Sequence, residues 1–158
     1  MTLTVSFYHL KFSPLEKITP RLVEKVYASG LRAFILVEDD ERLTQLNTSL
    51  WTYSTLAFLP HGCRLDSETT KDQQPIWLST TLENPNQSTV CVVTNQTVVE
   101  DPASFGFNRI LDIFDATLPE NIENFHKRHS FYAAKKATIT VWEQTKEGWQ
   151  AWTNPAIT

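Results

Sequence analysis

The sequence predicts a single three-layer α/β domain, in which a mostly parallel central sheet is flanked by helices. The first observation is the unbroken apolar run of residues 33–37, Ala-Phe-Ile-Leu-Val, which is typical of a strand buried on both faces of a parallel sheet. The second is the order of segments around this run, strand, helix and strand, which forms one βαβ unit. The third is the length of 158 residues with 41% hydrophobic content, which suits one compact domain.

The first strand is expected over residues 3–8, which are rich in β-forming side chains. Thr19 and Pro20 then predict the start of a helix, with threonine as the N-cap and proline in the first helical position. Gly30 is predicted to end this helix. Between these limits an apolar stripe is expected at Leu22, Val23 and Val26.

A second helix is expected after the apolar run, capped by Asp39 or Asp40. Its apolar stripe is predicted at Leu43, Leu46 and Leu50. At about 100° per residue, Trp51 lies off the centre of that stripe. Its ring is therefore expected at the edge of the buried face.

The second half of the chain is expected to alternate strands and turns before a last helix. Strands are predicted at residues 74–78, 90–94, 109–114 and 138–143, with a turn at 83–86. The last helix is predicted to begin at residues 117–120, which include a proline. Its inward row is expected at Ile122, Phe125, His129 and Tyr132.

The charge of the chain argues against nucleic acid as a direct partner. The formal net charge is −4, whereas proteins that grip nucleic acid carry broad basic surfaces. Residues 126–136 carry four cations and no acid, which leaves −8 on the rest of the chain. Such a basic island favours an acidic peptide or a carboxylate over a duplex.

Part of this basic island is predicted to line the outward face of the last helix. Arg128, Phe131 and Lys135 lie at offsets of three and seven residues, which places cation, ring and cation on one face. A stripe of this kind suits the capture of a C-terminal peptide. The alternative is a solvated helix face with one exposed ring.

A second candidate docking site lies in the bulky apolar run of residues 50–53 and 58–62, just where a polar loop begins. Trp51 and Phe58 bracket the start of this loop and are candidate anchors for a partner protein. The alternative is that both rings tuck under the loop and complete the core.

The sequence lacks the motifs of a nucleotide-binding or hydrolytic site. The turn at residues 9–14 contains no glycine, and neither a Walker pattern nor a Gly-x-Ser-x-Gly elbow occurs. Asp112 and Asp115 are explained as caps or solvated turns. The rival hypothesis is a small phosphoester- or nucleotide-processing enzyme that uses both with His61. No cofactor and no metal are expected, because the His61-x-Cys63 pair lacks a second pair of ligands.

The two cysteines, Cys63 and Cys91, are too few for a disulfide framework and indicate a reducing compartment. The first residues have neither a basic region nor a long apolar run, so neither a signal peptide nor a membrane span is predicted. A cytoplasmic protein is expected.

Taken together, these segments resemble the chi subunit of bacterial DNA polymerase III, an accessory protein of the clamp loader. The resemblance spans nearly the whole chain and depends on the order and spacing of short motifs. It implies one chi-like domain over residues 1–158, with a C-terminal tail at 146–158. The motifs are Ser6-Phe7-Tyr8, Val37-Glu38-Asp39, Leu50-Trp51-Thr52-Tyr53, Phe58-Leu59-Pro60-His61-Gly62, Gln74-Pro75-Ile76-Trp77-Leu78, Glu83-Asn84-Pro85-Asn86, Asp112-Ile113-Phe114-Asp115, Arg128 and Thr140-Val141-Trp142-Glu143-Gln144.

The resemblance implies a non-catalytic adaptor that reaches nucleic acid only indirectly. One face would bind the psi subunit of the clamp loader, or a competing helicase, through Trp51, Phe58, Leu59, Pro60 and His61. The last helix would bind the acidic C-terminal tail of single-stranded DNA-binding protein through His126, Lys127, Arg128, His129 and Lys135. A chi-like partner of a repair helicase is the alternative. Lys136 stands where the family usually has a glycine that ends this helix.

Overall fold

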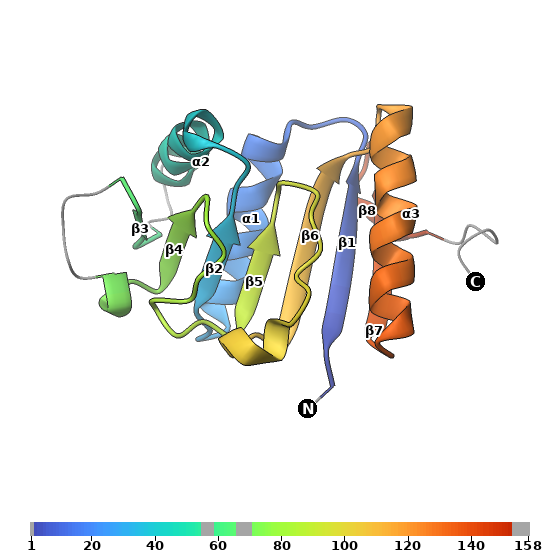
Figure 1. The fold of residues 1–158 in the computed structure, drawn as a ribbon. Coiled ribbons are helices and arrows are strands. Elements are labelled where there is room, and N and C mark those ends of the chain that lie inside the picture. Colours follow the sequence, from blue (N-terminus) through green and yellow to red (C-terminus); the bar gives the residue numbers. More distant parts are fainter. Residues whose placement is uncertain (1, 55–58, 66–70, 153–158) are drawn as a thin grey trace.

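A computed structural model, which describes residues 2–54, 59–65 and 71–152, contains an eight-stranded sheet with the strand order β3-β4-β2-β5-β6-β1-β7-β8 (Figure 1). Every pair of neighbours is parallel except β7 and β8. The predicted α/β class with a mostly parallel sheet is confirmed. The strands are β1 (Thr4–Leu10), β2 (Ala33–Leu36), β3 (Gly62–Cys63), β4 (Ile76–Ser79), β5 (Val90–Val93), β6 (Arg109–Asp115), β7 (Thr138–Gln144) and β8 (Trp149–Ala151).

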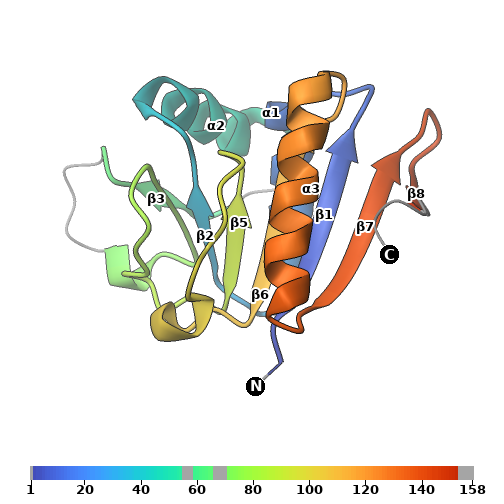
Figure 2. The ribbon, with the colours of Figure 1, turned by 45° about the vertical axis from the view of Figure 1, so that its right-hand side comes forward.

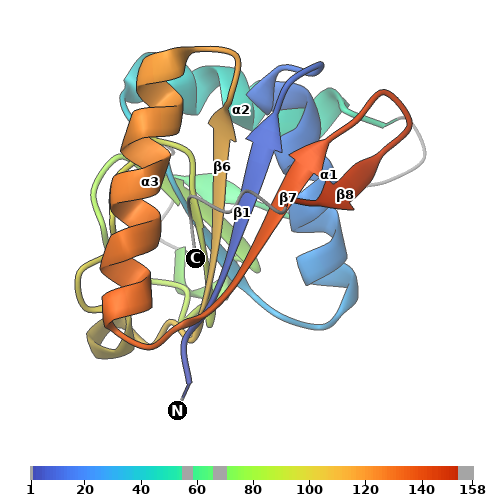
Figure 3. The same cartoon turned by 90° about the vertical axis from the view of Figure 1, so that its right-hand side faces the viewer.

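Three helices of the described residues cover the sheet on both faces, as the three-layer prediction required. Helices α1 (Leu15–Ala28) and α2 (Asp40–Thr52) lie on one face, and α3 (Pro119–Ala134) lies on the other (Figures 2 and 3). The core is divided accordingly: one buried cluster joins the sheet to α1 and α2, and a second joins it to α3. Short 3₁₀ turns η1 (Lys71–Gln73) and η2 (Pro102–Phe105) lie in the connections.

The strand predicted from the unbroken apolar run is confirmed in the interior of the sheet. All four residues of β2 are buried, and β2 pairs in parallel with β4 on one side and β5 on the other. A strand with neighbours at both edges and helices or packed loops on both faces exposes no side chain to water, which explains the absence of polar alternation.

Helix α1 begins earlier than predicted. Its N-cap is Pro14 with φ −70°, its first residue is Leu15, and Pro20 lies inside the helix. Leu15 and Ile18 extend the apolar stripe by one turn toward the N-terminus, and both pack against the core. This burial outweighs the hydrogen bond that Pro20 cannot donate. The predicted end is confirmed, since Gly30 follows the helix with φ +78°, a conformation that favours glycine.

Helix α2 follows its prediction closely. Asp39 is the N-cap, and its Oδ1 accepts a hydrogen bond of 2.7 Å from the backbone N–H of Arg42. The predicted stripe is buried, and Trp51 beside it is 50% exposed. The stripe consists of Leu43, Leu46 and Leu50.

The segment expected to form a C-terminal tail from residue 146 contains a strand instead. Thr145 and Gly148 close a tight turn, with the Thr145 N–H donating to the Gly148 carbonyl at 2.7 Å. Strand β8 then returns antiparallel to β7 and forms one edge of the sheet. Trp149 packs edge-on against Tyr8, with ring centroids 5.4 Å apart. This apolar contact stabilises the packing of the three-residue strand β8 against the sheet.

Candidate protein-docking surfaces

Trp51 forms an exposed aromatic surface at the C-terminal end of α2. Its side chain is half exposed, so the alternative in which this ring completes the core is wrong. Its ring centroid lies 4.2 Å from that of His61, with an interplanar angle of 45°. The His61 Nδ1 in turn lies 2.7 Å from the Leu59 carbonyl oxygen. The indole is therefore held against a buried imidazole while one side of it faces water.

Other residues expected to share this surface have different positions. Leu59 and His61 are buried, and Leu59 belongs to the core cluster beneath α1 and α2. Their side chains are therefore unavailable to a partner in this conformation, which corrects the expectation that they contact it directly. Pro60 is half-buried. Phe58 lies outside the described residues.

Arg128 on α3 points into the protein, not outward as predicted. It is 3% exposed, and its Nε and Nη2 donate to the two carboxylate oxygens of Asp112 at 2.7 and 3.1 Å. The guanidinium also lies 5.1 Å from the centroid of the Phe114 ring. The inward row of α3 is thus Phe125, Arg128 and Tyr132, because a completely buried carboxylate in β6 requires a cation.

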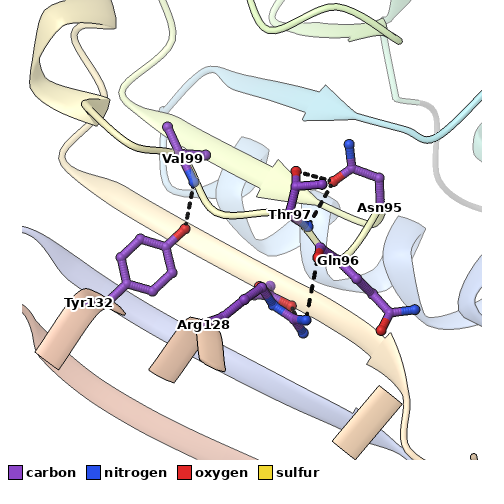
Figure 4. Close-up of polar contacts among 7 residues, drawn as sticks. Asn95, Gln96, Thr97, Val99, Arg128 and Tyr132 are labelled. Atoms are coloured by element: carbon purple, nitrogen blue, oxygen red, sulfur yellow. Dashed lines mark hydrogen bonds and ion pairs between the residues drawn. The ribbon is translucent and has the colours of Figure 1, made fainter. Parts of the chain in front are cut away.

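Arg128 and Tyr132 also attach α3 to the segment that follows β5 (Figure 4). The hydroxyl of Tyr132 accepts a hydrogen bond of 2.8 Å from the Val99 N–H, and Arg128 Nη1 reaches the Gln96 carbonyl at 3.5 Å. Burial raises the pKa of Asp112, and the adjacent guanidinium opposes that rise. These contacts fix the orientation of α3, and with it the direction in which its remaining side chains point.

The other basic residues of α3 remain at the surface. Lys127 and Lys135 are exposed, and Lys135 Nζ lies 5.0 Å from the centroid of the Phe131 ring. Phe131 and Lys135 are what remains of the predicted outward stripe. Lys136 follows the helix with φ +61°, a left-handed conformation that favours glycine. A lysine at this position carries backbone strain and adds a positive charge at the helix end.

His126 and His129 lie on the side of α3 that faces Phe7 of β1 and Trp152. The His126 ring lies 6.1 Å from that of Trp152, and the His129 ring lies 6.1 Å from that of Phe7. Desolvation and the neighbouring His126 lower the pKa of His129. Half-buried imidazoles beside the half-buried ring of Trp152 and the exposed Lys127 form a surface that suits an acidic, partly apolar peptide.

The three residues of the rival enzyme hypothesis do not converge. Asp112 is sealed in its ion pair, and Asp115 accepts hydrogen bonds from the N–H and hydroxyl of Thr117 at 2.9 and 2.6 Å. His61 precedes β3, four strands away from β6 in the sheet order, or about 19 Å at the usual strand spacing. Within the part of the chain that the structure describes, no group of three His, Cys, Asp or Glu residues could hold a metal ion.

The turn between β1 and α1 has its amides occupied by the protein itself. The backbone N–H groups of Lys11, Phe12 and Ser13 all donate to Gln144 Oε1, at 3.1, 2.9 and 3.1 Å. In nucleotide-binding α/β proteins the amides of this turn receive a phosphate. Here a side-chain amide from β7 fills that position.

Comparison with known proteins identifies the family of this chain. Residues 1–140 match the family described as DNA polymerase III chi subunit, HolC. The chain belongs to this family. It is also 32% identical, over 148 aligned residues, to the probable DNA polymerase III subunit chi of Rickettsia prowazekii (strain Madrid E), a match that covers 90% of this chain and 87% of that protein.

Membership of the chi family gives the protein a replication accessory role and implies association with the clamp loader complex. In the described residues, none of the helices is both long and apolar enough to cross a membrane.

Sequence reasoning missed the positioning residues of this chi-family chain. One signal was present: Asp112 interrupts an otherwise apolar strand, and a carboxylate in that setting needs a buried cation. Gln144 gave no comparable signal, because nothing near it in sequence shows which amides it would meet.

Proposed function

We propose that this chi-family protein is a non-catalytic adaptor that bridges the psi subunit of the clamp loader to the acidic C-terminal tail of single-stranded DNA-binding protein. The observation that carries the proposal is the presence of two separate candidate docking surfaces. Trp51 lies on one face of the sheet, at the end of α2, and the exposed cations lie on α3 against the other face (Figures 2 and 3). An adaptor needs two partners bound at once, and opposite faces allow this without steric competition.

The Trp51 surface supports docking of psi. A tryptophan that is half exposed in the free protein offers a large apolar area, and tryptophan is enriched among residues that dominate binding energy. Contact with His61 restricts the indole before the partner arrives, so little side-chain entropy is lost on association.

The exposed cations of α3 support docking of the acidic tail. Lys127 and Lys135 provide charge at the surface, and His126 and His129 provide half-buried imidazoles beside them. Arg128 acts through the position of α3, since its guanidinium is already paired with Asp112. Direct capture of the tail carboxylate is therefore assigned to the exposed cations instead.

The proposal is tested by calorimetry of the purified chain with psi and with a synthetic tail peptide. Trp51→Ala should weaken binding of psi by about 2 kcal/mol or more and leave the tail peptide unaffected. Leu65→Ala is the matched control, because Leu65 is an apolar side chain that is equally exposed.

In the second arm, Lys127→Ala and Lys135→Ala together should weaken binding of the tail peptide and leave binding of psi unaffected. Lys25→Ala, an exposed cation on α1, is the control. The proposal fails if Trp51→Ala binds psi as tightly as its control does, or if the double lysine variant binds the tail peptide as tightly as its control does. It also fails if psi and the tail peptide displace each other. Displacement of psi by a helicase would show that the Trp51 surface has alternative occupants.

A further inference from the structure

A cleft opens at the carboxyl ends of the central strands, and it includes neither Trp51 nor the basic residues of α3. Strands β1 and β6 are parallel neighbours, but the chain leaves β1 toward α1 on one face and leaves β6 toward α3 on the other (Figures 2 and 3). Diverging connections of this kind create a crevice, which is the usual ligand site of open α/β sheets. Here the cleft has a volume of about 610 Å³.

Two large apolar side chains stand at the rims of this cleft. Phe12, in the connection from β1 to α1, is 55% exposed, and Leu118, directly before α3, is 46% exposed. Leu118 occupies the N-cap position of α3, where a polar side chain is normally favoured, and it makes no capping hydrogen bond. Leu118 therefore does not stabilise the start of α3 by capping, and it leaves apolar surface exposed to water. Contact with a partner would explain both features.

The lining of the cleft is acidic. Glu16, Glu38 and Asp115 line it, together with Arg42 and Lys11. The Arg42 guanidinium is shared by Glu16 and Glu38. Lys11 Nζ is already 3.3 Å from the carboxylate of Glu143, which is not among the lining residues. The field that remains in the cleft therefore favours a cation.

The acidic surface also continues beyond the cleft. An adjacent depression of about 210 Å³ is lined by Glu38, Asp39 and Glu41 with Arg42. Anions find little support at this end of the sheet, because Gln144 already occupies the amides of the β1–α1 turn. Phosphate and acidic peptides are thus disfavoured, because the lining is acidic and the backbone N–H donors of the β1–α1 turn are already occupied.

We propose that this cleft docks a basic peptide segment of a partner protein, one in which an apolar side chain lies between lysines or arginines. The apolar side chain packs between Phe12 and Leu118, and the cations face Glu38 and Asp115. Complementary charge steers such a segment to the site. Burial of the Phe12 and Leu118 side chains against the apolar side chain of the peptide then contributes to affinity.

The test is an NMR titration of the ¹⁵N-labelled full chain with two amidated nine-residue peptides, one alternating lysine with leucine and one alternating glutamate with leucine. The lysine peptide should shift the amides of the non-proline residues in 11–16 and 115–121. The glutamate peptide should bind about tenfold more weakly or worse. Affinity for the lysine peptide should fall as salt is raised. Shifts that map elsewhere, or equal binding of the two peptides, would overturn the proposal.

Matched variants separate docking from folding. Leu118→Ser should weaken binding of the lysine peptide roughly fivefold or more. It should also raise the melting temperature of the protein, because serine is a good N-cap. Leu65→Ser removes an equally exposed leucine elsewhere and should leave the affinity unchanged. Since Leu118→Ser is expected to be folded and stabilised, a loss of binding cannot come from unfolding. Equal affinities of the two variants would refute the docking site.

Discussion

At the scale of single residues, the Arg128–Asp112 pair shows how one buried charge determines the role of another. Asp112 has no access to water and Arg128 is 3% exposed. Two hydrogen bonds between them satisfy the carboxylate, and the pair is flanked by the ring of Phe114. Such a pair is sensitive to the loss of one member, because the other is then left as an uncompensated charge in the core.

We therefore expect Arg128→Ala to destabilise the fold by about 3–5 kcal/mol, measured by urea unfolding. Lys127→Ala, the exposed neighbour on α3, should stay within about 0.5 kcal/mol of the parent. The double variant Arg128→Met with Asp112→Leu should recover most of the loss, since an apolar pair needs no compensation. Similar costs for Arg128→Ala and Lys127→Ala would contradict the buried pair.

His9 provides a second prediction at this scale. Its side chain is completely buried, and the rings of Phe114, Phe125 and Trp152 surround it. Among the residues that the structure describes, neither ring nitrogen has a hydrogen-bond partner. Desolvation lowers the pKa of His9 to about 3, with further contributions from the nearby positive charges of Lys11, His126 and Arg128.

The folded protein therefore resists protonation of His9, whereas the unfolded chain accepts a proton near the ordinary pKa of about 6.5. The stability that this difference provides is complete above pH 6.5 and is lost as the pH falls below it. His9 should contribute about 2 kcal/mol to the loss of stability between pH 7 and pH 5. His9→Leu, compared with the parent by urea unfolding at both pH values, should lose that much less. Equal losses in the two proteins would contradict it.

At the scale of elements, the turn between β1 and α1 is built by a residue from the far end of the chain. Gln144 Oε1 accepts three backbone hydrogen bonds from residues 11–13, and its Nε2 donates to the Ser13 hydroxyl at 3.0 Å. α1 begins directly after this turn. The side chain therefore couples β7 to the start of α1.

We expect Gln144→Ala to cost about 1–3 kcal/mol, because three partly buried donors lose their acceptor. Added phosphate or sulfate should raise the melting temperature of this variant more than that of the parent, since an anion can occupy the vacated amides. Gln150→Ala, a change on the exposed edge strand β8, is the control and should show neither effect. If Gln144→Ala melted at the same temperature as this control, the role of the Gln144 side chain in the turn would be refuted.

At the scale of the whole molecule, the charge distribution separates the surfaces by the kind of partner that each suits. The α3 face carries the exposed cations, and the carboxyl edge of the sheet carries Glu16, Glu38 and Asp115. With a formal net charge of −4, no broad basic groove is available to follow a phosphate backbone. The molecule is suited to binding peptides at several sites more than to binding DNA directly.

Binding of the isolated protein to single-stranded DNA should accordingly be weak. A titration of a fluorescent oligonucleotide at moderate salt should show no saturation at micromolar protein, because the few cations of α3 can neutralise only a few phosphates. Single-stranded DNA-binding protein under the same conditions is the positive control. Submicromolar binding by this chain alone would contradict the adaptor.

Local patterns in the sequence determined the elements that depend on neighbours along the chain. The apolar run of β2, the Asp39 cap of α2, the glycine that ends α1 and the proline at the start of α3 were all predicted from residues a few positions apart. Capping, left-handed turns and apolar periodicity act over one or two helical turns, so their signals are readable without a structure.

The tertiary structure alone decided which distant residues meet. Arg128 could be placed outward by helical spacing, but β6 lies beneath α3 and presents Asp112 to it. Leu59 and Gln144 likewise received their roles from contacts with segments far away in sequence. Sheet order determines these neighbours, and it follows from the combined packing of the whole chain, not from any short pattern.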